Sequence, residues 1–363
     1  MKISRLVPYV VGGLATLSLL AACGSGDSQS SVLGTSALSP DRMATLGHRV
    51  MSKSDIYLSV RPFKVHKDHR KSWVAPDIRR APRLLFIADA GTDDLYIFTM
   101  PALALRATIT GLDGPNGECT DRSGNVWVAN TDALDLLQYS RGGVLLNTLS
   151  DEAGYPVGCA VDPRTGNLAV TNYESFLDYG QVLIYPNATS PPTEEFRNRE
   201  IQYPFFPAYD LRGNLYVNGL DFGGNYILSE LAAGSDTLST VNVSGGTLYF
   251  PGMVQWNIVG RDLVLGDQFC NASQSSCIYS ATVSGSTVMI TGMTQLMNYE
   301  GGSICDMVQG ALTRLGRTAA AGGFFTCGTP STVNRWLFPS GGMPTNYNNS
   351  VVSAPIGAAI SNR

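Results

Sequence analysis

The side chains able to do catalytic chemistry are limited by a shortage of histidine. The 363-residue chain contains three histidines, His48, His66 and His69, so residues 84–363 contain none. A Ser-His-Asp triad, a Cys-His pair and a zinc site with histidine ligands are therefore excluded from that part of the chain. Walker and dinucleotide-binding glycine motifs are absent from the sequence as well. A metal site built on His66 and His69 would lack an evident third ligand.

Oxygen-bearing side chains are the remaining candidates for chemistry. Acidic or amide residues recur at the ends of short hydrophobic segments, as at Asp89, Asn130, Asn172 and Asp267. Carboxylate and amide oxygens are the ligands that Ca²⁺ prefers, so these four residues are candidate metal ligands. Asp267 and Glu174 are the candidates for a catalytic general base. The same side chains could instead cap their own turns, and their periodic recurrence favours that interpretation.

These side chains recur because the sequence itself repeats. A segment that begins with Pro, continues through Asp and Gly-Asn, and ends in a short hydrophobic strand occurs at 115–130, 156–172, 204–218 and, degenerately, 251–267. The four prolines are 41, 48 and 47 residues apart, a period typical of one four-stranded blade of a β-propeller. The Asp…Gly-Asn turn joins two strands rich in Val, Leu and aromatic residues. We therefore predict an all-β protein.

The two ends of the repeat array predict how the ring closes. Residues 84–110 supply only three strands, and the inner strand is missing. Residues 355–361 copy residues 156–162 nearly position for position, so we expect them to form the inner strand of the first blade and to close the ring. The prediction is a six-bladed β-propeller with blades at 84–111 plus 355–361, 114–150, 155–200, 203–245, 250–293 and 303–353.

The repeated Pro-x-Gly, Asp, Gly-Asn, hydrophobic-Val-x-Asn/Asp pattern resembles NHL-type and gluconolactonase-like six-bladed propellers over about 280 residues. The resemblance implies the fold, because the short motif is specific to a blade and not to an activity. Gluconolactonase-like propellers hold a divalent metal in the channel, which implies a Ca²⁺ site here. This sequence departs from that pattern, since its first blade has Asp89 where an early Glu is expected and no lysine follows Lys71.

The N-terminal region has the features of an export signal. Lys2 and Arg5 precede an apolar run over residues 6–20, which is too short and too rich in glycine for a membrane span. The run ends in Leu20-Ala21-Ala22-Cys23, followed by a Ser/Gly-rich stretch. This sequence resembles the lipobox of bacterial lipoproteins, which implies cleavage before Cys23 and lipidation of its thiol and amine. An ordinary signal peptide that ends in Cys is the alternative.

The lipobox resemblance implies a protein held in a bacterial cell envelope by its lipid, and in the outer membrane of a Gram-negative cell because no Asp follows Cys23. The predicted organisation is a signal peptide at 1–22, a lipidated cysteine and basic tether at 23–80, and the propeller at 81–363. The basic run at 64–71 is expected near the anchor, where it either contacts anionic headgroups or forms a solvated linker.

Cysteine usage supports export. Of the seven cysteines, lipidation of Cys23 leaves six, an even number suited to an oxidising compartment. Two of the six bracket a predicted turn in the fifth blade, and two lie at neighbouring strand ends of the sixth. The last two occupy nearly equivalent positions on adjacent inner strands and pair by elimination, with buried free thiols as the alternative. The predicted disulfides are Cys270–Cys277, Cys305–Cys327 and Cys119–Cys159.

Charge is unevenly distributed along the chain. Residues 1–83 contain 13 Lys and Arg against 5 Asp and Glu, whereas residues 84–363 contain 12 against 24, and all 12 are arginine. An acidic body is repelled by nucleic acid, so nucleic acid is excluded as a partner. We expect a monomer.

Two functions fit these observations. We favour a lipid-anchored propeller that binds a protein or glycan partner through its loop-rich face. The alternative is a divalent-metal-dependent lactonase or related hydrolase of the gluconolactonase-like type, with Ca²⁺ as a Lewis acid in the channel. Aromatic residues in predicted loops, namely Tyr173, Phe176, Tyr179 and Phe222, are candidates for a ligand surface.

Overall fold

A computed structural model describes residues 71–175, 179–189, 191–270, 275–323 and 330–362. Cys23, Phe176 and Cys327 lie outside the described residues. The described part is built from β-strands apart from two short 3-10 turns, η1 (Ile78–Arg80) and η2 (Pro186–Ala188). No helix within it is long and apolar enough to cross a lipid bilayer.

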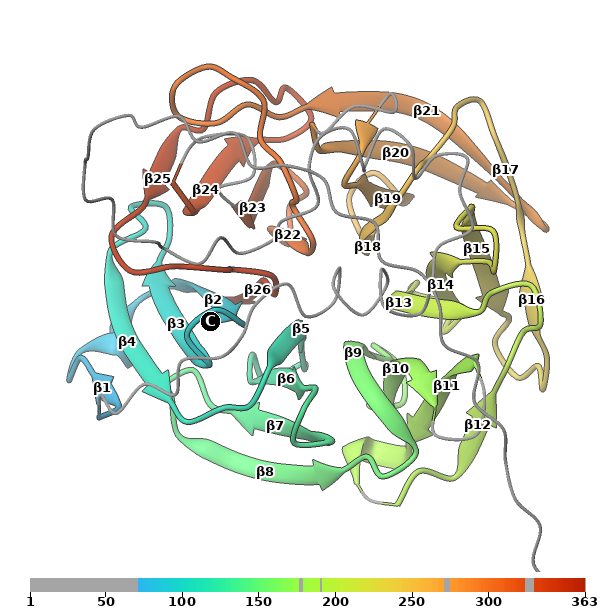
Figure 1. The fold of residues 1–363 in the computed structure, drawn as a ribbon, viewed down its shortest axis with the longest axis horizontal. Helices are drawn as coiled ribbons and strands as arrows, with labels where there is room; N and C mark the ends of the chain where they lie inside the picture. Colours follow the sequence, from blue (N-terminus) through green and yellow to red (C-terminus); the bar gives the residue numbers. More distant parts are fainter. Residues whose placement is uncertain (1–70, 176–178, 190, 271–274, 324–329, 363) are drawn as a thin grey trace, which may run out of the picture. The chain divides into compact units, whose positions relative to one another are not determined.

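Six sheets surround a central axis as the blades of a β-propeller, as predicted (Figure 1). The second, third and fourth blades each place four consecutive strands from the axis outward. Their strands are β5 (Pro115–Thr120), β6 (Val126–Asn130), β7 (Asp135–Tyr139) and β8 (Leu145–Ser150); β9 (Gly154–Val161), β10 (Leu168–Ser175), β11 (Tyr179–Tyr185) and β12 (Glu194–Phe196); and β13 (Tyr203–Tyr209), β14 (Leu215–Leu220), β15 (Tyr226–Leu231) and β16 (Leu238–Thr240).

The C-terminal strand closes the ring, which confirms the prediction drawn from the repeat. β26 (Ala359–Asn362) pairs antiparallel with β2 (Arg83–Asp89), and β3 (Asp94–Thr99) and β4 (Leu105–Thr110) complete the blade. A further strand, β1 (Trp73–Val74), pairs with β4. The first blade therefore begins inside the segment that the sequence assigned to the tether.

The fifth and sixth blades differ in detail from the prediction. β17 (Asn242–Ser244) was assigned to the fourth blade, but it runs parallel to β21 (Thr287–Gln295) at the outer edge of the fifth. The inner strand of the sixth blade was expected to open at Cys305, yet it begins only at Gly310, and Cys305 is buried in the preceding connection. The strands are β18 (Pro251–Asn257), β19 (Asp262–Asp267), β20 (Cys277–Ser284) and β21 (Thr287–Gln295) in the fifth blade, and β22 (Gly310–Leu312), β23 (Thr318–Gly323), β24 (Thr332–Leu337) and β25 (Asn346–Asn348) in the sixth.

The hydrophobic core lies between neighbouring blades. Because successive residues of a strand point to opposite faces of its sheet, a strand covered on both faces is apolar throughout. In β2, Leu84 and Phe86 pack with β6 of the second blade, whereas Leu85 and Ile87 pack with the sixth blade. Each blade is thus held by its two neighbours.

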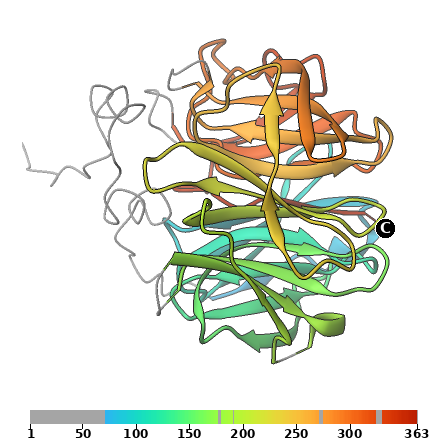
Figure 2. The same cartoon turned by 90° about the vertical axis from the view of Figure 1, so that its right-hand side faces the viewer.

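The alternation of strand direction gives the propeller two distinct faces. Turns between first and second strands, and between third and fourth strands, lie on one face, which we call the turn face. The remaining connections lie on the opposite face, which we call the connection face. Contacts between blades agree: Arg164 donates to the carbonyl of Arg212, and Ser361 donates to that of Gly124, each from one turn-face segment to the next. In the side view of Figure 2, the C-terminus marks the turn face.

Candidate functional site

A cavity of about 210 Å³ occupies the channel at the turn-face end. All six inner strands contribute to it, because each runs toward the turn face and ends beside the cavity. The strand-end residues that line it are Thr120, Val161, Tyr209, Trp256, Leu312 and Ile360.

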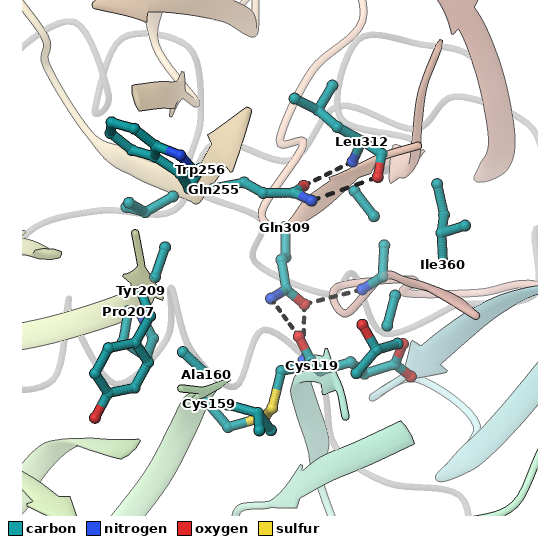
Figure 3. A pocket seen from close by; sticks show the side chains of 18 of the residues that line it. Cys119, Cys159, Ala160, Pro207, Tyr209, Gln255, Trp256, Gln309, Leu312 and Ile360 are labelled. Carbon is teal, nitrogen blue, oxygen red and sulfur yellow. Dashed lines mark hydrogen bonds between the residues drawn. A yellow bond between two sulfur atoms is a disulfide. The ribbon is translucent and has the colours of Figure 1, made fainter. Parts of the chain in front are cut away.

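Two glutamines fasten inner strands to one another across this cavity (Figure 3). Gln309 donates from Nε2 to the carbonyl of Glu118 (2.9 Å), and its Oε1 accepts the N–H groups of Glu118 (2.8 Å) and Ala358 (3.0 Å). Gln255 makes a similar clasp on the backbone of Leu312, at 2.7 and 3.4 Å. Because Gln309 joins the second blade to the C-terminal segment, it acts where the ring closes.

The carboxyl group of Glu118 is buried beside the cavity. Its side chain is 3% exposed, and neither oxygen has a hydrogen-bond partner among the described residues. Burial raises the pKa of the Glu118 carboxyl well above its usual range, and the nearby N–H dipoles of Ala359 and Ala88, which do not reach hydrogen-bond geometry, offset part of that rise. The sequence contains no local sign of this burial, because Glu118 stands in a polar stretch.

The predicted metal ligands Asp89 and Asp267 are instead turn and strand caps. Asp89 accepts four backbone N–H groups, from Gly91, Thr92, Ser353 and Ala354, at 2.6–3.2 Å. Asp267 accepts three, from Tyr249, Phe250 and Phe269, at 2.9–3.0 Å. Burial raises the pKa of both carboxyls, and these amides lower it in part. The cap interpretation left open by the sequence describes both residues.

Asn130 and Asn172 are engaged in the same way. Asn130 accepts the N–H of Asp113 (2.6 Å) and donates to Asp135 (2.9 Å). Asn172 donates from Nδ2 to Asp151 (3.0 Å). These bonds tie strand ends to the connections beside them, so the amide groups serve the blade that carries them.

The predicted ligand set does not fit a calcium site. In the described part of the chain, no group of three or more His, Cys, Asp or Glu side chains is placed to hold a metal ion. The carboxylates of Asp89 and Asp267 face N–H donors, whose positive ends occupy the directions that a cation would need. Asp267 is also ill placed as a general base for this reason. Glu174, the other candidate base, lies in β10, opposite Tyr179 in the sheet.

Two of the predicted disulfides are present. Cys119–Cys159 joins the inner strands of the second and third blades, with 5.6 Å between Cα atoms, and Cys270–Cys277 closes a short loop, with 5.7 Å. Cys305 is disulfide-bonded, and its predicted partner Cys327 lies outside the described residues.

The aromatic residues expected in loops have different roles. Tyr173 lies in β10 and Tyr179 begins β11, so neither is in a loop. Tyr173 is buried among the aromatic side chains between the third, fourth and fifth blades. Phe222 is in a connection-face turn, as predicted, and is 57% exposed. The prediction of an aromatic ligand surface is therefore wrong for Tyr173.

Exposed aliphatic side chains lie on one side of the cavity mouth on the turn face. They come from first turns of the fourth, fifth and sixth blades, and two of them, Leu211 and Ile258, also line the cavity. Their exposed fractions lie between 43% and 60%. Turns of this kind are ordinarily polar, and that departure was visible in the sequence. We call this set the aliphatic collar: Leu211, Ile258, Val259 and Leu315.

Comparison with known proteins identifies the fold and no family. No family model matches the sequence, and no curated protein matches it. Among solved structures, a protein of unknown function from Bacteroides caccae is similar, with a TM-score of 0.58 and 13% identity over 78% of this chain and all of that one. A chain of the nidogen/laminin complex is also similar, with a TM-score of 0.55 and 13% identity over 77% of this chain and 98% of that one.

Proposed function

We propose that this protein is a lipid-anchored binding module of the bacterial cell envelope, attached through Cys23, and that it binds an envelope component through its turn face. The lipobox-like sequence and the disulfides support an extracytoplasmic location. The similar chain in the nidogen/laminin complex supports the use of this fold in macromolecular binding.

The aliphatic collar is the observation that carries the proposal. Four exposed aliphatic residues lie on the first turns of three neighbouring blades, and two of them line the cavity. They form an apolar surface of the kind that marks interaction sites. The hydrolase alternative has no comparable support, because the carboxylates of Asp89 and Asp267 already accept backbone N–H groups.

Binding to isolated cell envelopes tests the proposal. The full chain carrying Cys23→Ser, which removes the lipid attachment site, is compared with the same chain carrying Leu211→Ser, Val259→Ser and Leu315→Ser. The matched control is Phe222→Ser, which removes an equally exposed apolar side chain from the connection face. We expect the collar variant to lose envelope binding and the control to keep it. Equal retention of both variants would reject the turn face as the binding site.

A further inference from the structure

The arginines of the propeller are concentrated on the turn face. Every first turn from the second blade to the sixth contains at least one arginine, and the second turn of the second blade contains another. The spacing follows the blade repeat, so each blade delivers its arginine to the same end of the channel. The turn-face arginines are Arg122, Arg141, Arg164, Arg212, Arg261, Arg314 and Arg317.

The acidic residues of the same turns are directed inward. Asp121, Asp162 and Asp210 open three of these turns, and each accepts backbone N–H groups of its own turn, such as those of Arg212 and Asn214 on Asp210, at 2.7 and 2.9 Å. Asp162 and Asp210 are buried, whereas the arginines beside them are exposed. The exposed acidic residues at this face are Asp77 before η1, Glu194 and Glu195 at the start of β12, and Asp236. The exposed arginines of the turns outnumber them, so the net charge that faces solvent there is positive.

The ion pairs among the described residues join Arg106 with Asp77 and Arg197 with Glu195. Neither pair involves the exposed arginines of the turns, which are Arg122, Arg164, Arg212, Arg261, Arg314 and Arg317. The described connections of the opposite face contain nine Asp and Glu and two Arg. The propeller has a net negative charge, but its two faces therefore carry charges of opposite sign.

Apolar side chains alternate with this charge. The collar residue Leu211 adjoins Arg212, and Leu315 lies between Arg314 and Arg317. Collar and arginines therefore form one surface. Protein surfaces that bind at a lipid interface combine basic side chains with exposed aliphatic ones, because lipid phosphates lie next to acyl chains there.

The same composition continues to the rim of the first and second blades. Arg141 donates to the carbonyl of Ala81 (2.7 Å), and the side chain of Arg79 lies over Gly142, so the turn at 140–144 packs against residues 79–81, which lead into β2. Arg79 and Arg80 are exposed. Three apolar residues of this rim are about half exposed: Val144, Leu145 and Leu146.

We infer that the turn face docks on an anionic lipid surface, which names the class of envelope component bound and rests on the function proposed above. Charge complementarity supports lipid phosphates as the contact of the arginines, and the aliphatic collar supports insertion between headgroups. A soluble polyanionic glycan would match the arginines but would leave the collar exposed to water.

Vesicle binding tests the inference. The full chain with Cys23→Ser is mixed with vesicles of phosphatidylglycerol and phosphatidylcholine, with vesicles of phosphatidylcholine alone, and with heparin as a soluble polyanion. We expect binding to the anionic vesicles that weakens with salt, and little binding to the other two. Arg212→Glu, Arg261→Glu and Arg314→Glu together should weaken it at least about tenfold. The collar variant should weaken it too, whereas Arg199→Glu with Phe222→Ser on the connection face should not.

Other results would overturn the inference. Unchanged vesicle binding by the arginine variant would assign the interaction to the basic residues before residue 71. Heparin binding that depends on the same arginines, without vesicle binding, would indicate a glycan. If the protein bound cell envelopes in a way that the collar variant abolished, but did not bind vesicles, the proposed function would be kept. Only the lipid partner would then be rejected.

Discussion

Replacing Gln309 tests whether the hydrogen bonds of its amide group to Glu118 and Ala358, which we call the glutamine clasp, stabilise the closed ring. Gln309→Met keeps a side chain of similar length and volume and removes its amide. Three hydrogen bonds are lost, at 2.8, 2.9 and 3.0 Å, to two N–H groups and one carbonyl on the second blade and the C-terminal segment. These bonds go to backbone groups, so no hydrogen bond to another described side chain is lost.

The expected cost follows from these bonds. A buried hydrogen bond contributes about 1 kcal/mol net, so the loss of three should lower the free energy of unfolding by about 3 kcal/mol. Gln255→Met is the matched control, since Gln255 makes two such bonds, one of them long at 3.4 Å. Gln255 is also half-exposed, so water can replace part of its contribution. Its replacement should cost about 1 kcal/mol.

Urea unfolding of the oxidised chain, followed by tryptophan fluorescence, measures both values. A loss below about 0.5 kcal/mol for Gln309→Met would mean that the clasp adds nothing measurable to closure. If Gln255→Met lowered the free energy of unfolding as much as Gln309→Met or more, the reasoning would also be contradicted. The bonds at the ring closure would then be no more important than those between two blades that the chain already joins.

Two further predictions concern stability. Burial raises the pKa of Asp151 from 3.8 to about 6, although Asn172, Ala153 and Tyr185 oppose the rise. The folded state therefore binds the proton more tightly, and stability should fall by up to about 3 kcal/mol as pH rises from 4 to 7. Asp151→Asn should remove this part of the pH dependence in urea unfolding, and an unchanged dependence would contradict the assignment. Removing the Cys119–Cys159 disulfide with serines should cost about 4 kcal/mol and removing Cys270–Cys277 about 2.5 kcal/mol, because the first closes a separation of 40 residues and the second one of 7. Thermal unfolding of the two double variants measures the order, and the reverse order would show that chain entropy does not control it.

The blades were predictable from the sequence because each is a local unit. The Asp…Gly-Asn turns and the apolar strands repeat with the period of a blade, and the copy of residues 156–162 at 355–361 was enough to predict ring closure. Prediction failed where the repeat is irregular. The inner strand of the sixth blade and the parallel strand β17 depend on pairing with distant segments, which no local pattern specifies.

The roles of the polar residues could not be read from the repeat. Asp89 and Asp267 have the chemistry of metal ligands in the sequence, but the chain brings backbone N–H groups to them, in part from residues far away such as Ser353 and Ala354. Gln309 was not singled out at all, since its partner Glu118 is 191 residues away. A hydrogen bond of this kind exists only once the ring is closed.

By itself, the sequence determined most of the strands, the blade repeat, the closing segment and the number of charges. The tertiary structure alone decided where those charges act. The arginine in the first turns recurs in the sequence, but so does an aspartate beside it. Counted from the sequence alone, the two opposite charges of such a turn sum to zero. Folding turns Asp162 and Asp210 inward onto backbone amides and leaves Arg164 and Arg212 in solvent. The sign of the charge that a protein surface exposes depends on which side chains point to solvent. That direction is fixed only when the turns fold.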